Sequence, residues 1–183
     1  MEFRLFYRGL LKSNGDRAEK QNVRRQFHPQ LKKLWIQEPL AGSEEYLDGN
    51  SERIHLVYPI SNFNFACLIS ERHKTYAELD ILFLRPEPSG QIIKTGGGDI
   101  DNRLKTLFDG LRRPMEANEI PTGDQPQSGE TPFHCLLSDD ALITKVTVAT
   151  DQLLDAKSQD EVVLIIHVRI KSRHTTWESM GFF

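Results

Sequence analysis

The chain has 183 residues, of which 38% are hydrophobic and 27% are charged, and its formal net charge at pH 7 is −3. This length fits one domain with a substantial core, and this composition excludes a disordered chain. No apolar run approaches the ~20 residues that cross a bilayer, and the charged residues within 1–11 do not resemble a signal peptide. Cys67 and Cys135 have no paired spacing, which excludes a zinc signature and is typical of free thiols in a reducing cytoplasm.

The first part of the chain predicts a strand followed by a basic helix. Residues 2–10 alternate loosely between two faces, which indicates a strand. A turn at 13–16 precedes a helix from Ala18 onward, in which we expect Pro29 to cause a kink or a new start. Residues 1–36 contain nine Lys and Arg side chains against three acidic ones. This excess is typical either of a solvated helix face or of a surface that follows a phosphate backbone.

The rest of the chain predicts strands around one short helix. An acidic loop at 37–52 is followed by six expected elements: strands at 54–58, 63–70 and 76–84, a helix at 100–111, and strands at 141–150 and 162–170. The last strand is the most apolar, so we expect it at the centre of the sheet. The order of elements predicts an α+β fold, with one domain over residues 1–183 and a mixed β-sheet flanked by helices.

The most informative segment is residues 99–105, with the sequence DIDNRLK. Two carboxylates at i and i+2 on an extended chain point to the same face, roughly 7 Å apart, and Lys105 lies one helical turn after Asp101. A second acidic pair, Asp139-Asp140, precedes a predicted strand. Mg²⁺ prefers oxygen ligands of this kind, and it would activate water while Lys105 stabilises charge on phosphate oxygens. The pattern predicts a nuclease metal site formed by Asp99, Asp101 and Asp140.

Each of these residues also has a simpler structural explanation. Asp99 or Asp101 can cap the helix, because aspartate is a preferred capping residue and favours the positive end of the helix dipole. Lys105 can be an i, i+4 partner of Asp101, and Asp139-Asp140 can form a turn. The complete pattern, D-x-D-N-x-x-K followed by D-D before a strand, is harder to explain in this way and favours the metal site.

These residues resemble the RusA-type Holliday junction resolvases. The core pattern of that family is D-[LI]-D-N-x-x-K-x-x-x-D-x-L, followed after a short connection by D-D-[AS]-x-[VI]. Residues 99–111 meet every fixed position of the first part, and residues 139–143 meet every fixed position of the second. The resemblance is strong over about residues 99–148, and the first strand and helix and the last strand follow in a consistent order.

The resemblance implies a small α/β homodimer with an acidic site in each subunit. Such an enzyme cuts four-way DNA junctions during recombination and repair, with symmetric nicks made by phosphodiester hydrolysis and with Mg²⁺ or Mn²⁺ as its cofactor. The family's essential aspartates, which bind the metal, fall on Asp99, Asp101 and Asp140, and its essential lysine falls on Lys105. Three further residues are candidate supporting positions: Asp139 as a neighbour of the site, and Asn102 and Asp109 as structural residues.

Two segments depart from the family. Residues 37–62 look inserted, and residues 112–137 replace a short connection with a long one, for which a lid, a reader of substrate shape and a dimer contact are all open roles. These insertions and the acidic net charge keep two alternatives open. One is a nuclease that acts on other branched DNA or on RNA, and the other is a non-catalytic nucleic-acid-binding protein of the same fold.

The remaining signals are weaker. The run Gly96-Gly97-Gly98 lacks the G-K-[ST] ending of a phosphate-binding loop, so we expect no nucleotide cofactor. The histidines show no paired metal spacing, although His134 lies near Asp139 in sequence and is a candidate to reach the site. We expect Trp35 in the core, whereas Trp177 is a candidate for base stacking or for a dimer contact.

Overall fold

The computed structural model of the chain describes residues 1–49, 55–87 and 100–172. In this part the chain forms seven strands and two α-helices, which occur in the order β1 (Glu2–Leu10), α1 (Arg17–Leu34), β2 (Val57–Ile60), β3 (Phe63–Ile69), β4 (Thr75–Arg85), α2 (Ile100–Leu111), β5 (Phe133–Leu137), β6 (Ile143–Gln152) and β7 (Glu161–Ser172). The expected α+β class is confirmed. Neither α-helix within the described ranges is long and apolar enough to cross a membrane.

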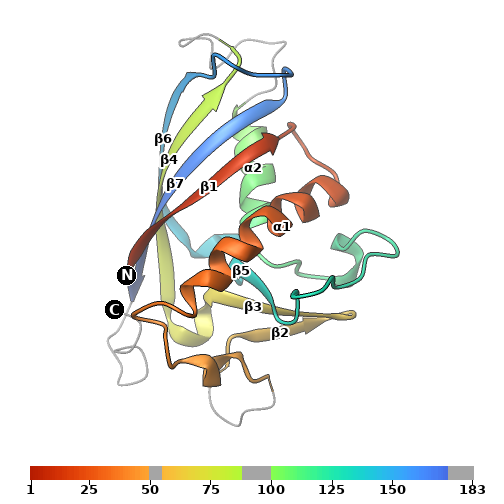
Figure 1. The fold of residues 1–183 in the computed structure, drawn as a ribbon, viewed down its shortest axis with the longest axis vertical. Coiled ribbons are helices and arrows are strands. Elements are labelled where there is room, and N and C mark those ends of the chain that lie inside the picture. Colours follow the sequence, from red (N-terminus) through yellow and green to blue (C-terminus); the bar gives the residue numbers. More distant parts are fainter. Residues whose placement is uncertain (50–54, 88–99, 173–183) are drawn as a thin grey trace.

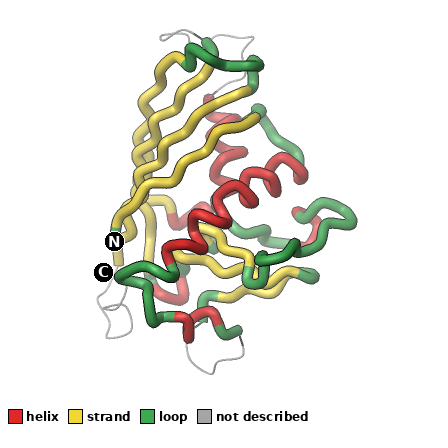
Figure 2. The backbone as a smooth tube through the Cα atoms, viewed as in Figure 1, coloured by secondary structure: helices red, strands yellow, loops and turns green. Residues whose placement is uncertain are grey.

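The strands form two mixed sheets where the sequence predicted one. The larger sheet has the order β1-β7-β4-β6, and the smaller has the order β2-β3-β5. In the larger sheet β7 pairs antiparallel with β1 and β4, while β4 and β6 are parallel. The expected internal position of β7 is therefore confirmed. Figure 1 shows both helices on one side of the larger sheet, with α1 crossing towards β5, and Figure 2 shows the same layers by element type.

Helix α1 is fixed by a cap at its start and by one buried face. The Asp16 carboxylate accepts a hydrogen bond from the Glu19 N–H (2.9 Å), and the Glu19 carboxylate accepts one from the Asp16 N–H (2.9 Å), which forms a capping box. The expected new start at Pro29 is wrong, because one helix continues through this residue. Pro29 lies on the exposed side, and the buried side chains of Phe27 and Leu31 hold the helix against the core on either side of it.

Two strands of the smaller sheet differ from the sequence prediction. Strand β2 occupies Val57–Ile60 and so begins later than the expected strand at 54–58. Strand β5 is not among the expected strands. It forms the last five residues of segment 112–137, for which the sequence predicts only a long connection. All five of its residues, FHCLL, are buried. A strand that is buried on both faces has no alternating pattern, so periodicity does not reveal it.

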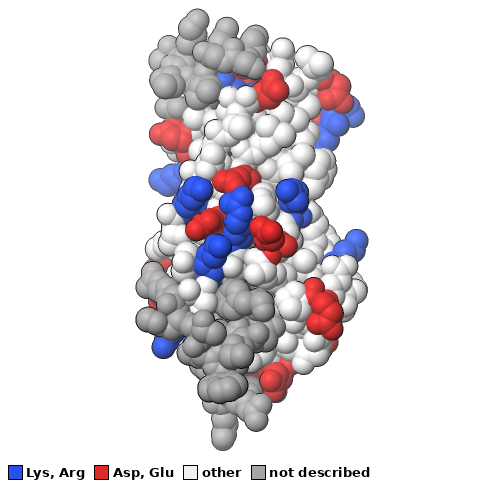
Figure 3. Space-filling view, turned by 90° about the vertical axis from the view of Figure 1, so that its left-hand side faces the viewer, with Lys and Arg blue, Asp and Glu red and all other residues white. Residues whose placement is uncertain are grey.

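The face of the larger sheet that is turned away from the helices is exposed to solvent. Figure 3 looks onto this face and shows side chains of both charges gathered near its middle, below an uncharged area. The Arg169 guanidinium pairs with Asp80 (2.6 Å) and lies 3.6 Å from Glu2. An uncharged row crosses three neighbouring strands at paired positions, formed by the exposed side chains of Phe6, Ile165 and Leu82. On this face Arg169 is therefore engaged by two acidic side chains, and the uncharged row lies beside this charged group.

Candidate active site

Helix α2 presents the motif residues on one stripe. Asp101, Lys105, Phe108 and Arg112 follow at i, i+4, i+7 and i+11, which places them on the same side of an α-helix. Asp101 and Lys105 are exposed, whereas Leu107 is buried on the opposite side. The helix therefore holds the predicted carboxylate and the predicted lysine towards solvent.

The start of α2 carries Asp101 in its first turn. One carboxylate oxygen of Asp101 accepts a hydrogen bond from the Asn102 N–H (2.7 Å), and first-turn N–H groups lack partners within the helix. This contact is with the next residue, whereas a capping side chain accepts from the N–H two or three residues ahead, and the exposed carboxylate keeps further acceptor positions for a cation. Asp99 and the run Gly96-Gly97-Gly98 lie outside the described residues.

The second acidic pair divides into a structural residue and a residue that faces α2. The Asp139 carboxylate accepts a hydrogen bond from the Ala141 N–H (2.8 Å) and caps a short 3-10 turn at Asp140–Leu142. Asp140 is half-exposed, and its Oδ1 lies 3.9 Å from Nε of Arg112. Partial burial raises the pKa of Asp140, the Arg112 guanidinium lowers it, and the adjacent Asp139 raises it, with a net upward shift. Perturbed carboxyl groups of this kind are typical of functional sites.

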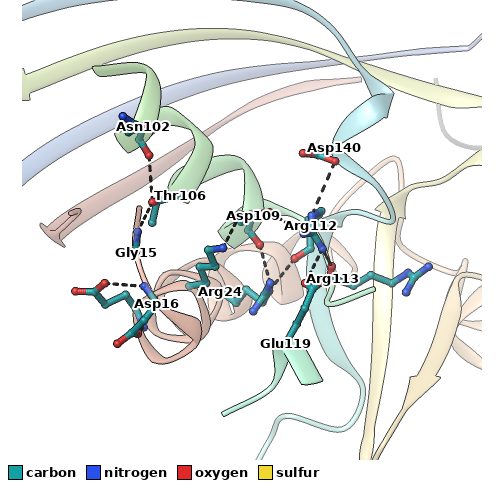
Figure 4. Close-up of polar contacts among 12 residues, drawn as sticks. Gly15, Asp16, Arg24, Asn102, Thr106, Asp109, Arg112, Arg113, Glu119 and Asp140 are labelled. Carbon is teal, nitrogen blue, oxygen red and sulfur yellow. Dashed lines mark hydrogen bonds and ion pairs between the residues drawn. The ribbon is translucent and has the colours of Figure 1, made fainter. Parts of the chain in front are cut away.

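Two of the predicted metal ligands lie near opposite ends of α2. Asp101 and Arg112 are eleven positions apart in the chain, which corresponds to roughly 16 Å along the helix axis. Asp140 approaches the Arg112 end of the stripe, and Figure 4 shows it away from Asn102 at the start of the helix. Within 1–49, 55–87 and 100–172, no group of three or more His, Cys, Asp or Glu side chains is placed to hold a metal ion. The predicted three-aspartate set includes Asp99, which is outside these ranges.

Arg112 joins the end of α2 to Asp140 and to the 112–137 segment. Its Nη2 lies 2.7 Å from Oδ1 of Asp109, and its Nη1 lies 2.9 Å from Oε2 of Glu119. With Asp140, three carboxylates from three parts of the chain thus surround one guanidinium (Figure 4). The sequence motifs singled out neither Arg112 nor Glu119. The helical spacing from Asp101 and Lys105 is the signal that points to Arg112, whereas no local pattern points to Glu119.

Asp109 connects the two helices through its side chain, whereas Asn102 contributes a backbone contact. The second carboxylate oxygen of Asp109 lies 2.7 Å from Nζ of Lys20 on α1. Burial alone would raise the pKa of Asp109, but Lys20 and Arg112 outweigh it and lower that pKa. The Asn102 carbonyl accepts a hydrogen bond from Oγ1 of Thr106 (3.2 Å), and the same Oγ1 accepts one from the Gly15 N–H (2.9 Å), which connects α2 to the turn before α1.

The 112–137 segment is docked against α1. The Arg25 guanidinium pairs with Asp124 (2.8 Å) and with Glu130 (3.0 Å), and Nζ of Lys32 donates to the Gly129 carbonyl (2.8 Å). Asp124 and Glu130 are largely buried by this contact. The segment is therefore fixed on the α1 side of the molecule, and Glu119 is the residue through which it reaches the Arg112 cluster.

The basic residues of the N-terminal region are mostly used within the fold. Lys12 pairs with Glu19 (2.7 Å), while Lys20 and Arg25 make the contacts described above. Arg24 is 1% exposed, and its guanidinium donates to the backbone carbonyls of Arg112 and Asp109 (2.8 Å each). Because these basic side chains are paired within the fold, the contacts do not favour a phosphate-binding surface formed by them.

His134 is a buried residue of β5, and its ring packs towards α1. Its backbone N–H donates to Nδ1 of His28 (2.9 Å), and its ring packs against those of His28 and Trp35. Burial lowers the pKa of His134 to about 3. The structure thus surrounds His134 with core aromatic residues, and the expected core position of Trp35 is confirmed. Cys67 and Cys135 are buried free thiols, as expected, and Trp177 lies outside the described residues.

No family model, curated protein or solved structure matched the chain.

Proposed function

We propose that the protein is a RusA-like endonuclease that resolves four-way DNA junctions by Mg²⁺- or Mn²⁺-dependent hydrolysis of phosphodiester bonds. The observation that carries this proposal is the D-x-D-N-x-x-K run at the start of α2, followed by D-D at the end of β5. The fold supports it in one respect: Asp101 and Lys105 are exposed on one face of α2.

The chemistry of the donor set fits a hard divalent cation. Asp101 and Asp140 offer carboxylate oxygens with access to solvent, and these are the ligands that Mg²⁺ and Mn²⁺ accept together with water and phosphate. Asp139 lies beside Asp140 and raises its pKa, so a bound cation would relieve the repulsion between the two carboxylates. In this proposal the metal ligands are Asp99, Asp101 and Asp140, with Asp139 as a neighbour that increases the local negative charge. Asp101 and Asp140 lie near opposite ends of α2 in this structure, so the described residues do not form the complete site, and binding of one ion by both carboxylates requires the start of α2 to approach Asp140.

The roles of the protein groups follow from their positions. The bound metal would supply an activated water and a Lewis acid for the phosphate oxygens. Lys105 would bind a phosphate oxygen, because its exposed ammonium lies one turn from Asp101 on the same face. A homodimer with one such site in each subunit would make the paired nicks that junction resolution requires.

The test compares a labelled four-way junction with a matched linear duplex, in Mg²⁺ and in EDTA, for the wild type and Asp101→Asn. We expect paired nicks on the junction that require Mg²⁺, and we expect Asp101→Asn to lose them while it keeps its melting temperature. The matched control is Asp16→Asn, the same substitution at the start of α1. Asparagine caps a helix as well as aspartate does, so a capping role alone would make both variants behave alike. Loss of folding in Asp101→Asn would contradict the metal-ligand role.

A second candidate function is favoured by the 112–137 segment, which is long and firmly docked beside Arg112. Such a segment would alter substrate choice, so the enzyme would cut other branched DNA or RNA. A panel of junction, flap, duplex and single-stranded substrates separates the two, because equal rates on all of them would exclude junction specificity. Binding without any Mg²⁺-dependent turnover would instead favour the non-catalytic alternative, which the net charge of −3 motivates.

A further inference from the structure

The solvent-exposed face of the larger sheet carries an apolar row that crosses all four of its strands. One exposed side chain comes from each strand, in the spatial order β1, β7, β4 and β6: Phe6, Ile165, Leu82 and Ala149. Both α-helices lie on the opposite face (Figure 1), and none of the four residues belongs to the core. Single apolar side chains on a surface are ordinary, whereas a contiguous group of them indicates an interaction site.

Charged residues on the two outer strands, β1 and β6, have opposite signs at paired positions of this face. On one side of the apolar row, a second row runs from β1 to β6 as Arg8, Val163, Leu84 and Asp151. On the other side, near the start of β1, a third row runs as Glu2, Arg169, Glu78 and Lys145. The second row thus starts with a cation and ends with an anion, and the third starts with an anion and ends with a cation.

This distribution makes the face complementary to a second copy of itself. A two-fold axis parallel to the strands, between β7 and β4, places β1 of one copy over β6 of the other and β7 over β4. Ile165 then meets the partner's Leu82, and Arg8 meets the partner's Asp151. The charged residues of the third row also meet residues of opposite sign. A two-fold axis across the strands lacks this property, because it brings Arg4 onto the partner's Arg8.

The edge of the sheet at β1 is less suited to association than the face. The Phe6 N–H donates to the side-chain oxygen of Gln30 (2.9 Å), and the Gln30 side-chain amide donates to the Phe6 carbonyl (2.7 Å). Gln30 of α1 therefore occupies the backbone groups that an added strand would need in the middle of β1. The Phe6 side chain itself remains 52% exposed on the face.

The face is large enough for a specific dimer. Four strands with nine paired residues on β1 cover roughly 600 Å² of flat surface, at roughly 4.8 Å between strands and roughly 3.3 Å per residue. Two such faces bury at least about 1,200 Å², which is the lower end of the range for stable, specific interfaces. Aligned packing of two sheets, at about 30° between their strands, is a standard arrangement.

We propose that this face is the interface of a symmetric dimer of the chain, with the two-fold axis along the strands and with Ile165 and Leu82 at its centre. The dimer uses no catalytic residue and needs no metal. It therefore goes beyond the proposed function, which assumes a homodimer without assigning its surface. Because both α-helices lie on the other side of the sheet, association leaves Asp101 and Lys105 uncovered.

The first test measures self-association by sedimentation equilibrium, in EDTA and without DNA. The wild type should dimerise, and Ile165→Glu should raise the Kd more than about tenfold, because it buries two unpaired charges at the centre of the interface. The matched control is Ile36→Glu, the same substitution at a residue just after α1 that is 77% exposed. That control should dimerise like the wild type. Circular dichroism of each variant establishes that it is folded.

A second test uses charge exchange at the rim, where substitutions do not disturb the core. Glu2→Lys and Lys145→Glu should each weaken the homodimer about threefold or more, because like charges then face each other twice. In an equimolar mixture of the two variants, every residue at position 2 faces a residue of opposite charge at position 145. Association in the mixture should therefore return to the level of the wild type.

Three results would overturn the proposed interface. A wild type that stays monomeric up to about 100 µM would mean that another partner, or another part of the chain, covers this face. A dimer that Ile165→Glu leaves intact would form through a different surface. A mixture of the charge variants that associates no better than either alone would exclude this axis. A protein that dimerises as proposed but cuts no junction supports the interface and contradicts the proposed function, so the two fail separately.

Discussion

Replacing Gly110 by alanine should destabilise the protein, although alanine is the better helix former. Gly110 is buried within α2, where the helix packs against Val23 of α1. A Cβ atom at this position would lie 2.4 Å from Cγ1 and 2.7 Å from Cβ of Val23. Neither distance is compatible with van der Waals contact, so the two helices have to move apart or the Val23 side chain has to turn.

The steric cost should exceed the gain in helix propensity. Alanine in a helix interior is favoured over glycine by about 1 kcal/mol, whereas overpacking a core costs about 1–3 kcal/mol. Val23 is β-branched and has one strongly preferred rotamer in a helix, so it cannot turn away cheaply. Separation of the helices is opposed by the Lys20–Asp109 ion pair and by the buried Arg24, which donates to the Asp109 carbonyl. The steric cost should therefore lie near the upper end of the range of about 1–3 kcal/mol, so the free energy of unfolding should fall by about 1–2 kcal/mol.

Urea unfolding of the wild type, Gly110→Ala, Val23→Ala and the double variant measures this prediction. Val23→Ala removes the γ carbon at 2.4 Å but keeps the Cβ at 2.7 Å, so it relieves part of the clash. The double variant should be less destabilised than the sum of the two single variants, because the closest contact exists only when both larger side chains are present. A Gly110→Ala protein that is more stable than the wild type, or strict additivity in the double variant, would refute the steric argument.

Two further predictions concern the core and the docked segment. Burial lowers the pKa of His134 from 6.5 to about 3, so the unfolded chain binds this proton first as the pH falls. The free energy of unfolding should therefore decline from about pH 6.5 towards pH 3. His134→Phe should reduce this decline, which urea unfolding at pH 7 and pH 4.5 measures. If the variant shows the same pH dependence as the wild type, His134 is not its cause. Arg25→Gln removes the ion pairs with Asp124 and Glu130, so a protease that cleaves after glutamate should cut the docked segment several times faster. Arg17→Gln, an exposed change on the same helix, should leave the cutting rate unchanged.

Several elements could be predicted from the sequence because their signals are local. The bounds of α2 follow from an apolar stripe with helical spacing, and β1 and β4 follow from alternation between two faces. Strand β5 could not be found in this way, because both of its faces are buried and its five residues show no alternation. The sequence also left open a new helix at Pro29, whereas the structure has one helix, in which Phe27 and Leu31 pack into the core on either side of the proline.

The division of the strands into two sheets is also a tertiary result. Strand β5 pairs with β3, and β6 pairs with β4, although only a short turn separates β5 from β6 along the chain. No local property of β5 or β6 specifies these partners, since both pairings are between strands that are distant in sequence. The pairing depends on which apolar faces can be buried together once the helices are in place.

By itself the sequence determined the chemistry offered by the candidate site. The spacing of Asp101 and Lys105 in a helix requires that they share one face, and the type of side chain limits the ligands to oxygen donors and an ammonium group. Only the tertiary structure decided which charges surround Asp140. Glu119 reaches Arg112, and Arg112 faces Asp140, because the chain after α2 returns beside the end of β5, where the Arg113 N–H donates to the Leu137 carbonyl (3.0 Å). Coulomb interactions depend on distance in space, and distance along the chain does not reveal it.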